Sequence, residues 1–282
     1  MDAVEVSGLS KAYDAVEAVR GIDFAIGAGE VFGLLGPNGA GKTTTVEILV
    51  GYRRRDAGQV RVLGRDPAQA DSGWRARIGV VPQSGELFPN LTVREHLDLF
   101  AGYYDDPRPP SEVLTLVGLD DKADAKTRTL SGGQKRRLDL GVALVGNPEL
   151  IFLDEPTTGF DPGARRAAWE TIRALRSLGK TILLTTHYIE EAHRLADRVA
   201  VLRHGEIVAS GTPAELIAEA PASVIRYRRN GEEVVIQTEE PTRVLHDLTG
   251  QALRDGFDLD ALEVHRPTLE DIYLALTEER TE

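Results

Sequence analysis

Five short runs of the chain are almost entirely apolar, whereas the segments between them carry the spacing typical of helices. These runs are residues 31–36, 78–83, 150–155, 181–187 and 199–205. Strands buried on both faces, as in a parallel sheet covered by helices, are continuously apolar instead of alternating. The pattern therefore predicts an α/β core that extends from Val4 to about Gly211.

The pattern changes after this core. Two strand-like runs flank Asn230 and Gly231, a dipeptide that favours a hairpin turn, and a helical stretch follows at about 242–255. The last segment, 267–277, places apolar residues at i, i+3, i+4 and i+7. Its apolar face consists of Leu269, Ile272, Tyr273 and Leu276. It suits packing inside a small domain or contact with another subunit. We expect a main domain at 1–214 and an α+β domain at 215–282.

A phosphate-binding loop follows the first buried run. The segment Gly36-Pro-Asn-Gly-Ala-Gly-Lys-Thr43 matches G-x-x-x-x-G-K-[ST] between a predicted strand and a predicted helix. Glycines let the backbone turn its N–H groups toward a phosphate, and the N-terminus of the following helix adds a favourable dipole. Lys42 is expected to bind the β- and γ-phosphates of a nucleotide, and the Thr43 hydroxyl is expected to bind Mg²⁺.

Two carboxylates end the third buried run. Ligands gather at the carboxyl ends of parallel strands, and Asp154 and Glu155 are predicted to lie there. Asp154 is suited to holding Mg²⁺, directly or through water. Glu155 remains available to polarise the water that attacks a γ-phosphate. A solvated acidic strand end is the alternative.

Composition limits the environment and the partners. The 282 residues carry a net charge of −12 and no cysteine, which excludes disulfides and thiolate zinc sites. Residues 215–282 carry −9 of that charge, so the main domain is nearly balanced. Neither part has the strongly basic balance of a nucleic-acid binder. No run approaches the roughly 20 apolar residues that span a bilayer, and the start lacks a secretory signal pattern. We expect a soluble, cytoplasmic protein.

A third motif, Leu130-Ser-Gly-Gly-Gln134, lies 88 residues after Lys42 and 25 before Glu155. The motif alone is ordinary turn chemistry. In this order and context, however, the chain resembles the ATP-binding subunits of ABC transporters from about Val4 to Gly211. The resemblance implies a cassette fold, with a mostly parallel sheet, an antiparallel β part, and a helical subdomain at about 84–145.

The resemblance also implies roles for further residues. Tyr13 resembles the aromatic residue that stacks on adenine, and Gln83 the glutamine that senses Mg²⁺ and the attacking water. His187 resembles the histidine that contacts the γ-phosphate, and Asp161 the acidic residue that contacts the other subunit's site. Phe160 stands where the family usually has leucine. The other expected nucleotide contacts are Gly36, Pro37, Asn38, Gly39, Ala40, Gly41, Thr44, Ser131, Gly132, Gly133 and Gln134.

In this family the segment Ser131-Gly132-Gly133, called the Ser131 segment below, completes the ATP site of a second cassette. One chain carries one phosphate loop and one such segment, so we expect a head-to-tail dimer that buries two ATP molecules. The reaction implied is attack of water on the γ-phosphate of Mg-ATP. The second partner implied is a separately encoded membrane permease, which would hold the chain on the cytoplasmic face of the membrane.

The permease contact is predicted at residues 84–104, where Phe88, Leu91, Leu99 and Phe100 supply more apolar surface than a loop needs. A helical subdomain with its own core is the alternative. The motifs together with the segment 267–277 resemble the type-2 exporters, particularly the daunorubicin/doxorubicin resistance ATP-binding family. Drug or hydrophobic-compound efflux is therefore the first functional expectation. The alternatives are a soluble ABC ATPase that acts on a macromolecule, a lipid or polysaccharide exporter, and an importer.

Overall fold

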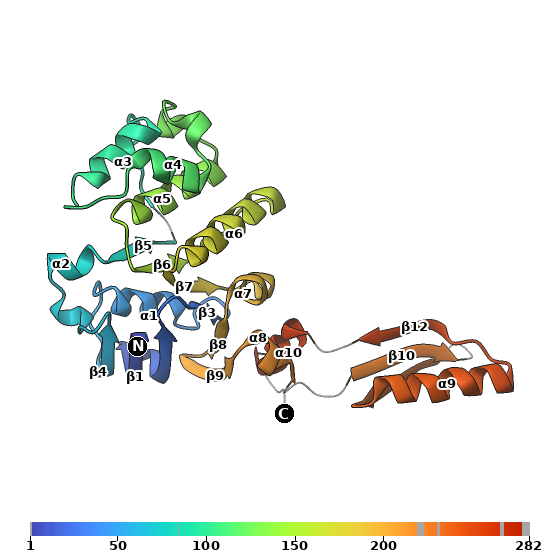
Figure 1. The fold of residues 1–282 in the computed structure, drawn as a ribbon. Coiled ribbons are helices and arrows are strands. Elements are labelled where there is room, and N and C mark those ends of the chain that lie inside the picture. Colours follow the sequence, from blue (N-terminus) through green and yellow to red (C-terminus); the bar gives the residue numbers. More distant parts are fainter. Residues whose placement is uncertain (1, 84, 219–222, 230–231, 266–267, 278–282) are drawn as a thin grey trace. The chain divides into compact units, whose positions relative to one another are not determined.

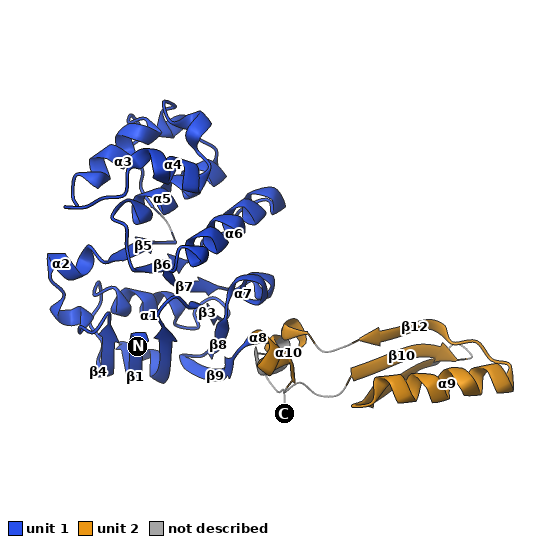
Figure 2. Cartoon of the chain, in the orientation of Figure 1, with its two compact units in different colours: residues 1–212 blue, residues 213–282 orange. Residues whose placement is uncertain are grey.

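A computed structural model describes residues 2–83, 85–218, 223–229, 232–265 and 268–277 (Figure 1). The chain divides into two compact units, residues 1–212 and 213–282, which are described separately (Figure 2). No helix among the described residues is long and apolar enough to span a membrane.

A six-stranded sheet forms the centre of the first unit, with strand order β5-β6-β7-β3-β8-β9. Its strands are β3 (Val31–Leu35), β5 (Ile78–Val81), β6 (Leu150–Asp154), β7 (Thr181–Thr186), β8 (Arg198–Arg203) and β9 (Glu206–Gly211). All neighbours are parallel except β8 and β9. The five predicted apolar runs supply five of these strands. Burial of both sheet faces explains why they lack alternation.

A second, antiparallel sheet packs beneath the first, with strand order β2-β1-β4. It consists of β1 (Asp2–Tyr13), β2 (Val16–Gly27) and β4 (Ala57–Val62). Side chains of the two sheets and of α1 (Lys42–Leu49) share one apolar core. Within this core, the rings of Phe24 and Phe32 stack with centroids 5.4 Å apart. The core fixes the position of the loop between β3 and α1.

Helices cover the other face of the central sheet (Figure 1). The helical subdomain contains α3 (Val93–Ala101), α4 (Pro110–Val117) and α5 (Gly132–Val145), and its core is continuous with that beneath α6 (Pro162–Ser177). The remaining elements of this unit are α2 (Ser72–Arg75), α7 (Ile189–Leu195) and 3-10 turns at Pro67–Gln69, Asp120–Lys122 and Thr127–Thr129. The helical subdomain therefore shares one apolar core with the central sheet and α6.

The second unit contains a three-stranded antiparallel sheet in the order β11-β10-β12. Its elements are α8 (Pro213–Ala218), β10 (Ser223–Arg229), β11 (Glu232–Thr238), α9 (Pro241–Asp255), β12 (Asp260–His265) and α10 (Leu269–Thr277). Ile225 and Tyr227 of the sheet pack against Leu248 of α9. The predicted α+β character is confirmed. The turn residues Asn230 and Gly231 lie outside the described residues, as do Pro267 and the side chain of Leu276.

Candidate active site

The phosphate loop is held between β3 and α1 by close backbone contacts. A Cβ atom on Gly36 would lie 2.3 Å from the Leu202 carbonyl oxygen, and one on Gly41 would lie 2.3 Å from that of Ala18. Gly41 also has φ = 104°, which disfavours any residue with a side chain. It precedes α1 without giving it a side-chain cap. The N–H groups of the first helical turn are therefore available to an anion.

Lys42, the first residue of α1, turns back over this loop. Its Nζ donates to the carbonyl oxygens of Gly36 and Pro37 at 2.8 and 3.1 Å. The same atom lies 3.2 Å from Oε1 of Glu155, and both side chains are buried. The loop and the end of β6 thus meet at one ammonium group, where the phosphates of a nucleotide are predicted to bind.

Glu155 is the centre of a polar cluster. Its Oε2 accepts hydrogen bonds from Gln83 Nε2 and Thr158 Oγ1, both at 3.2 Å, and lies 3.5 Å from Nδ1 of His187. Burial raises the pKa of the Glu155 carboxyl, but the charges of Lys42 and His187 and the hydrogen bonds outweigh burial and hold this pKa below its usual value. The carboxyl is therefore ionised at neutral pH, as a general base requires.

The backbone of Glu155 is constrained as well. Its φ of 47° is unusual for a residue other than glycine, and its N–H donates to Thr185 Oγ1 at 3.0 Å. Such conformations occur where the surrounding structure determines them, often at functional sites. This conformation directs the carboxylate toward Lys42 instead of along the strand.

Asp154 lies beside Glu155 and faces the start of α1. One of its carboxylate oxygens accepts a hydrogen bond from Thr185 Oγ1 at 2.5 Å and lies 3.4 Å from Thr43 Oγ1, which donates to it. Hydroxyl and carboxylate oxygens are the ligands that Mg²⁺ prefers. The predicted metal residues Thr43 and Asp154 are therefore adjacent, and Gln83 contacts the neighbouring carboxylate.

Tyr13 lies at the end of β1, with 36% of its surface exposed. Two cations approach its ring: the Arg53 guanidinium carbon lies 5.1 Å, and Lys11 Nζ 5.5 Å, from the ring centroid. Arg53 is in turn held by Glu47 at 2.5 Å. The ring is thus partly open to solvent, and adenine stacking stays a prediction.

The residues predicted to meet a second subunit form caps of helices. Ser131 and Gln134 form a reciprocal capping box at the start of α5, and Asp161 accepts hydrogen bonds from Gly163 and Ala164 at the start of α6. Ser131 and Gly132 are exposed. Within the described part of the chain, no hydrogen bond joins Ser131 or Gln134 to the phosphate loop. The Ser131 segment presents its helix N-terminus outward.

Three further residues contact the site although the sequence pattern does not single them out. Thr158 and Thr185 contact Glu155 and Asp154, and Arg136 donates to the backbone at the end of β6. Thr185 carries one signal, its place near the end of an apolar strand, two residues before His187. The other two carry no signal that separates them from ordinary polar residues.

The fold is that of an ABC transporter ATP-binding cassette. The model of the family "ABC transporter" matches residues 19–158. The chain belongs to the ABC transporter ATP-binding proteins and is an ATPase that hydrolyses ATP for transport.

Its relatives agree in length as well as in sequence. The chain is 41% identical over 300 residues to Nod factor export ATP-binding protein I of Rhizobium sp. (strain N33), covering 98% of this chain and 97% of that one. It is 42% identical over 303 residues to the protein of the same name from Burkholderia thailandensis, covering 97% of this chain and 96% of that one.

Solved structures match too. A structure of the ATP-binding subunit of an ABC transporter aligns with a TM-score of 0.72 at 25% identity, over 98% of this chain and 100% of that one. The dimeric post-hydrolysis structure of an ATP-binding cassette bound to ADP and Pi aligns with a TM-score of 0.67 at 27% identity, over 74% of this chain and 98% of that one. The predicted cassette fold is confirmed.

Proposed function

We propose that this chain hydrolyses Mg-ATP with Glu155 as the general base. The observation that carries the proposal is the convergence on one buried carboxylate of Lys42, Gln83 and His187, which come from three separate segments. In this arrangement Glu155 accepts a proton from the attacking water. Gln83 and His187 orient that water and the γ-phosphate, and Lys42 binds the β- and γ-phosphates.

Thr43, Asp154 and Gln83 would hold Mg²⁺ next to the phosphates. Their oxygen atoms fit the ion, since Thr43 Oγ1 and an Asp154 carboxylate oxygen are 3.4 Å apart. The bound ion would neutralise charge on the β- and γ-phosphates. Tyr13 would stack on the adenine, and the backbone of residues 36–41 with Thr44 would bind phosphate oxygens.

The second part of the proposal is a head-to-tail dimer. Ser131, Gly132, Gly133 and Gln134 of one copy, together with Asp161, would complete the ATP site of the other. Support comes from the exposed N-terminus of α5 and from the dimeric cassettes among the matching structures. A helix N-terminus that presents free N–H groups suits the γ-phosphate of ATP bound to a second copy.

The third part is a membrane permease that docks on the helical subdomain and holds the chain at the cytoplasmic face of the membrane. A groove of about 810 Å³ lies between this subdomain and α1. Phe100, Tyr104 and Val142 line it on the subdomain side, and Thr43, Gln83 and Asp154 line it as well. In the segment predicted to contact the permease, Phe88 is 51% exposed, and Ser84 lies outside the described residues. A short amphipathic helix fits such a groove and would reach Gln83.

The cargo follows from the relatives rather than from the site. Proteins 39–42% identical to this chain carry Nod factor export in their names. This similarity favours the lipid or polysaccharide exporter, one of the alternatives left open by the sequence, over the drug exporter expected first. We infer export of a compound of the Nod factor class through a separately encoded permease.

The ATPase role is tested by Glu155→Gln, with Glu190→Gln as its control. Glu190 is an exposed glutamate of α7 that pairs with Arg194. Loss of a general base is expected to lower kcat roughly 10² to 10⁴-fold, whereas Glu190→Gln leaves kcat unchanged. Light scattering of Glu155→Gln with ATP and Mg²⁺ should detect a dimer. Equal hydrolysis rates would remove Glu155 as the base, and a persistent monomer would contradict the dimer.

The permease role is tested by co-purification with the product of a neighbouring gene that encodes transmembrane helices. Phe88→Ala and Leu91→Asp together are expected to abolish recovery of the permease. Leu253→Asp, at an exposed leucine of the second unit, is the control. Undiminished recovery with the double variant would place the docking surface elsewhere. Uptake of a Nod factor and of daunorubicin into inverted vesicles would then separate the two cargo classes.

A further inference from the structure

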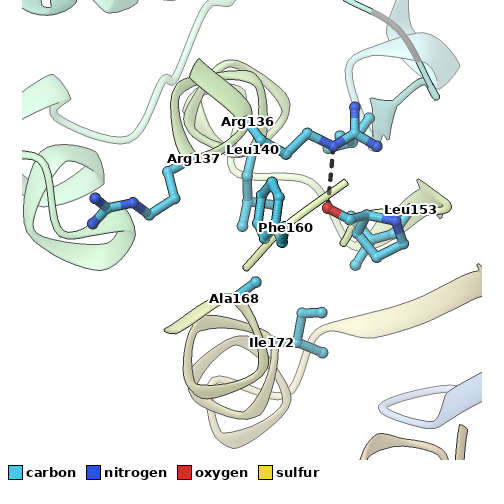
Figure 3. Close-up of a pocket in the computed structure, with 9 residues that line it drawn as sticks. Arg136, Arg137, Leu140, Leu153, Phe160, Ala168 and Ile172 are labelled. Atoms are coloured by element: carbon cyan, nitrogen blue, oxygen red, sulfur yellow. Dashed lines mark hydrogen bonds between the residues drawn. The ribbon is translucent and has the colours of Figure 1, made fainter. Parts of the chain in front are cut away.

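Arg136 of α5 reaches across to the ends of two strands of the central sheet. Its guanidinium donates to the backbone carbonyl oxygens of Pro82, Gln83, Asp154, Glu155 and Pro156. The bonds to Asp154 and Pro156 are 2.8 and 3.2 Å long, and Figure 3 marks the bond to Pro156. One side chain from the helical subdomain therefore binds the backbone on both sides of the catalytic cluster.

An arginine side chain is well suited to binding several backbone carbonyl oxygens at once. A guanidinium presents five N–H donors in a fixed planar fork, whereas a lysine offers a single point charge. The carbonyl groups lie at the carboxyl ends of β5 and β6, where the sheet's own hydrogen bonds are ending. Leu140, Leu153 and Phe160 surround a cavity of about 20 Å³ beside Arg136 (Figure 3). Burial lowers the pKa of Arg136, but an arginine stays charged at neutral pH.

The acceptors matter because three of them belong to predicted site residues. Gln83 contacts the Glu155 carboxylate, and Asp154 and Glu155 supply the predicted metal and base positions. The donor matters because Ser131, which caps the start of α5, is predicted to contact ATP bound to a second copy. Arg136 lies five positions after Ser131, which corresponds to a rise of roughly 7.5 Å along the helix. The helix is too short to bend appreciably over that distance.

We propose that Arg136 is a positioning residue that couples the Ser131 end of α5 to the backbone of Glu155 and Gln83 in the same chain. Contact of Ser131 with the partner copy's ATP then sets the geometry of this copy's general base. The two sites of a dimer would respond to each other through this side chain. The inference rests on the head-to-tail dimer and on the catalytic role of Glu155 proposed above.

The adjacent arginine provides a matched control. Arg137 lies on the same helix and also donates to carbonyl oxygens, those of Gly118 at 2.6 Å and Val117 at 3.4 Å. Both acceptors belong to the helical subdomain. Arg137 thus stabilises that subdomain internally, whereas Arg136 connects it to the central sheet. A purely structural role for arginine on this helix would make the two positions equivalent.

The experiment compares Arg136→Lys, Arg136→Gln and Arg137→Lys with the wild type. It measures kcat, KM and the Hill coefficient for ATP, together with the affinity for ADP. Arg136→Lys and Arg136→Gln are expected to lower kcat by roughly 10- to 100-fold, because a displaced base loses alignment. The Hill coefficient should fall toward one, since cooperativity requires coupling between the sites. ADP affinity and the kinetics of Arg137→Lys should stay within about twofold of the wild type.

Several results would overturn the inference: a kcat within twofold of the wild type in both Arg136 variants, an unchanged Hill coefficient, or an equal loss in Arg137→Lys. Loss of ADP binding in parallel with kcat would assign Arg136 to folding alone. Glu155→Gln is measured in the same series. If Glu155→Gln is inactive but Arg136→Lys is normal, only the coupling fails. If Glu155→Gln is fully active, the proposed function fails.

Discussion

Lys42 Nζ lies 3.2 Å from Oε1 of Glu155, and the two side chains are 4% and 6% exposed. The residue predicted to bind phosphate therefore already holds the predicted base. Breaking a buried ion pair is costly because the remaining charge is left uncompensated. An incoming triphosphate would compete with Glu155 for Lys42 and so free the carboxylate for water. If the proposed roles of Lys42 and Glu155 hold, the pair would link nucleotide binding to activation of the base.

The Lys42–Glu155 pair is expected to make folding stability depend on pH. The pKa of Glu155 is lower in the folded chain than its ordinary value of 4.5, so the unfolded chain binds more protons. The ionised Glu155 therefore contributes to the free energy of unfolding above pH 4.5, and this contribution disappears as pH falls through the lowered pKa. We expect the wild type to melt above Glu155→Gln at pH 6, and the gap to narrow toward pH 3. A gap that is constant from pH 6 to pH 3 would contradict the pairing.

Gly36→Ala is expected to destabilise the first unit and abolish nucleotide binding. The new Cβ would lie 2.3 Å from the Leu202 carbonyl oxygen, which belongs to a buried strand and cannot move aside. Overpacking of this kind costs roughly 1–3 kcal/mol. Thermal melting and ADP titration measure both effects. Wild-type ADP affinity in this variant would show that the loop tolerates displacement from β8.

Gly132→Ala separates folding from dimer function. A Cβ at Gly132 meets no atom within 4 Å, and the residue lies in the first turn of α5. The melting temperature and ADP binding should therefore match those of the wild type. ATP hydrolysis is expected to fall roughly 10-fold or more, because the methyl group would intrude where the partner's γ-phosphate is proposed to bind. Full activity would be incompatible with the proposed role of this segment.

Glu191→Gln is expected to stabilise the chain more as pH rises. Glu191 is fully buried and accepts hydrogen bonds from Thr157 at 3.0 Å and Trp169 at 3.2 Å. Burial raises its pKa above the ordinary 4.5, so the folded chain binds the extra proton and stability decreases as pH rises above 4.5. Glutamine does not titrate, and it keeps an acceptor oxygen.

Thermal melting from pH 4 to pH 8 tests this expectation. The difference in melting temperature between Glu191→Gln and the wild type should grow toward pH 8. Glu190→Gln, at the exposed neighbouring position, should show little change across the same range. A difference that shrinks with rising pH would show that Glu191 is stabilised in its ionised form.

The sequence by itself determined the elements and the chemistry that local patterns encode. Continuous apolar runs are dictated by burial on both faces of a sheet, so β3, β5, β6, β7 and β8 could be predicted. The phosphate loop could also be predicted from the sequence, because close backbone contacts require glycine at positions 36 and 41. The order of the motifs indicated the family, but the drug-export expectation depended on resemblance and was not supported by the relatives.

Only the tertiary structure decided which distant residues meet. Thr43 and Asp154 are 111 residues apart in the chain, yet their oxygen atoms are 3.4 Å apart. Thr185, Glu191 and Arg136 acquire their partners from strand order and helix packing, which no single-sequence period records. Hydrogen bonds to backbone carbonyl groups leave no mark on the acceptor's residue type. The contacts of Arg136 could therefore be found only once the chain was folded.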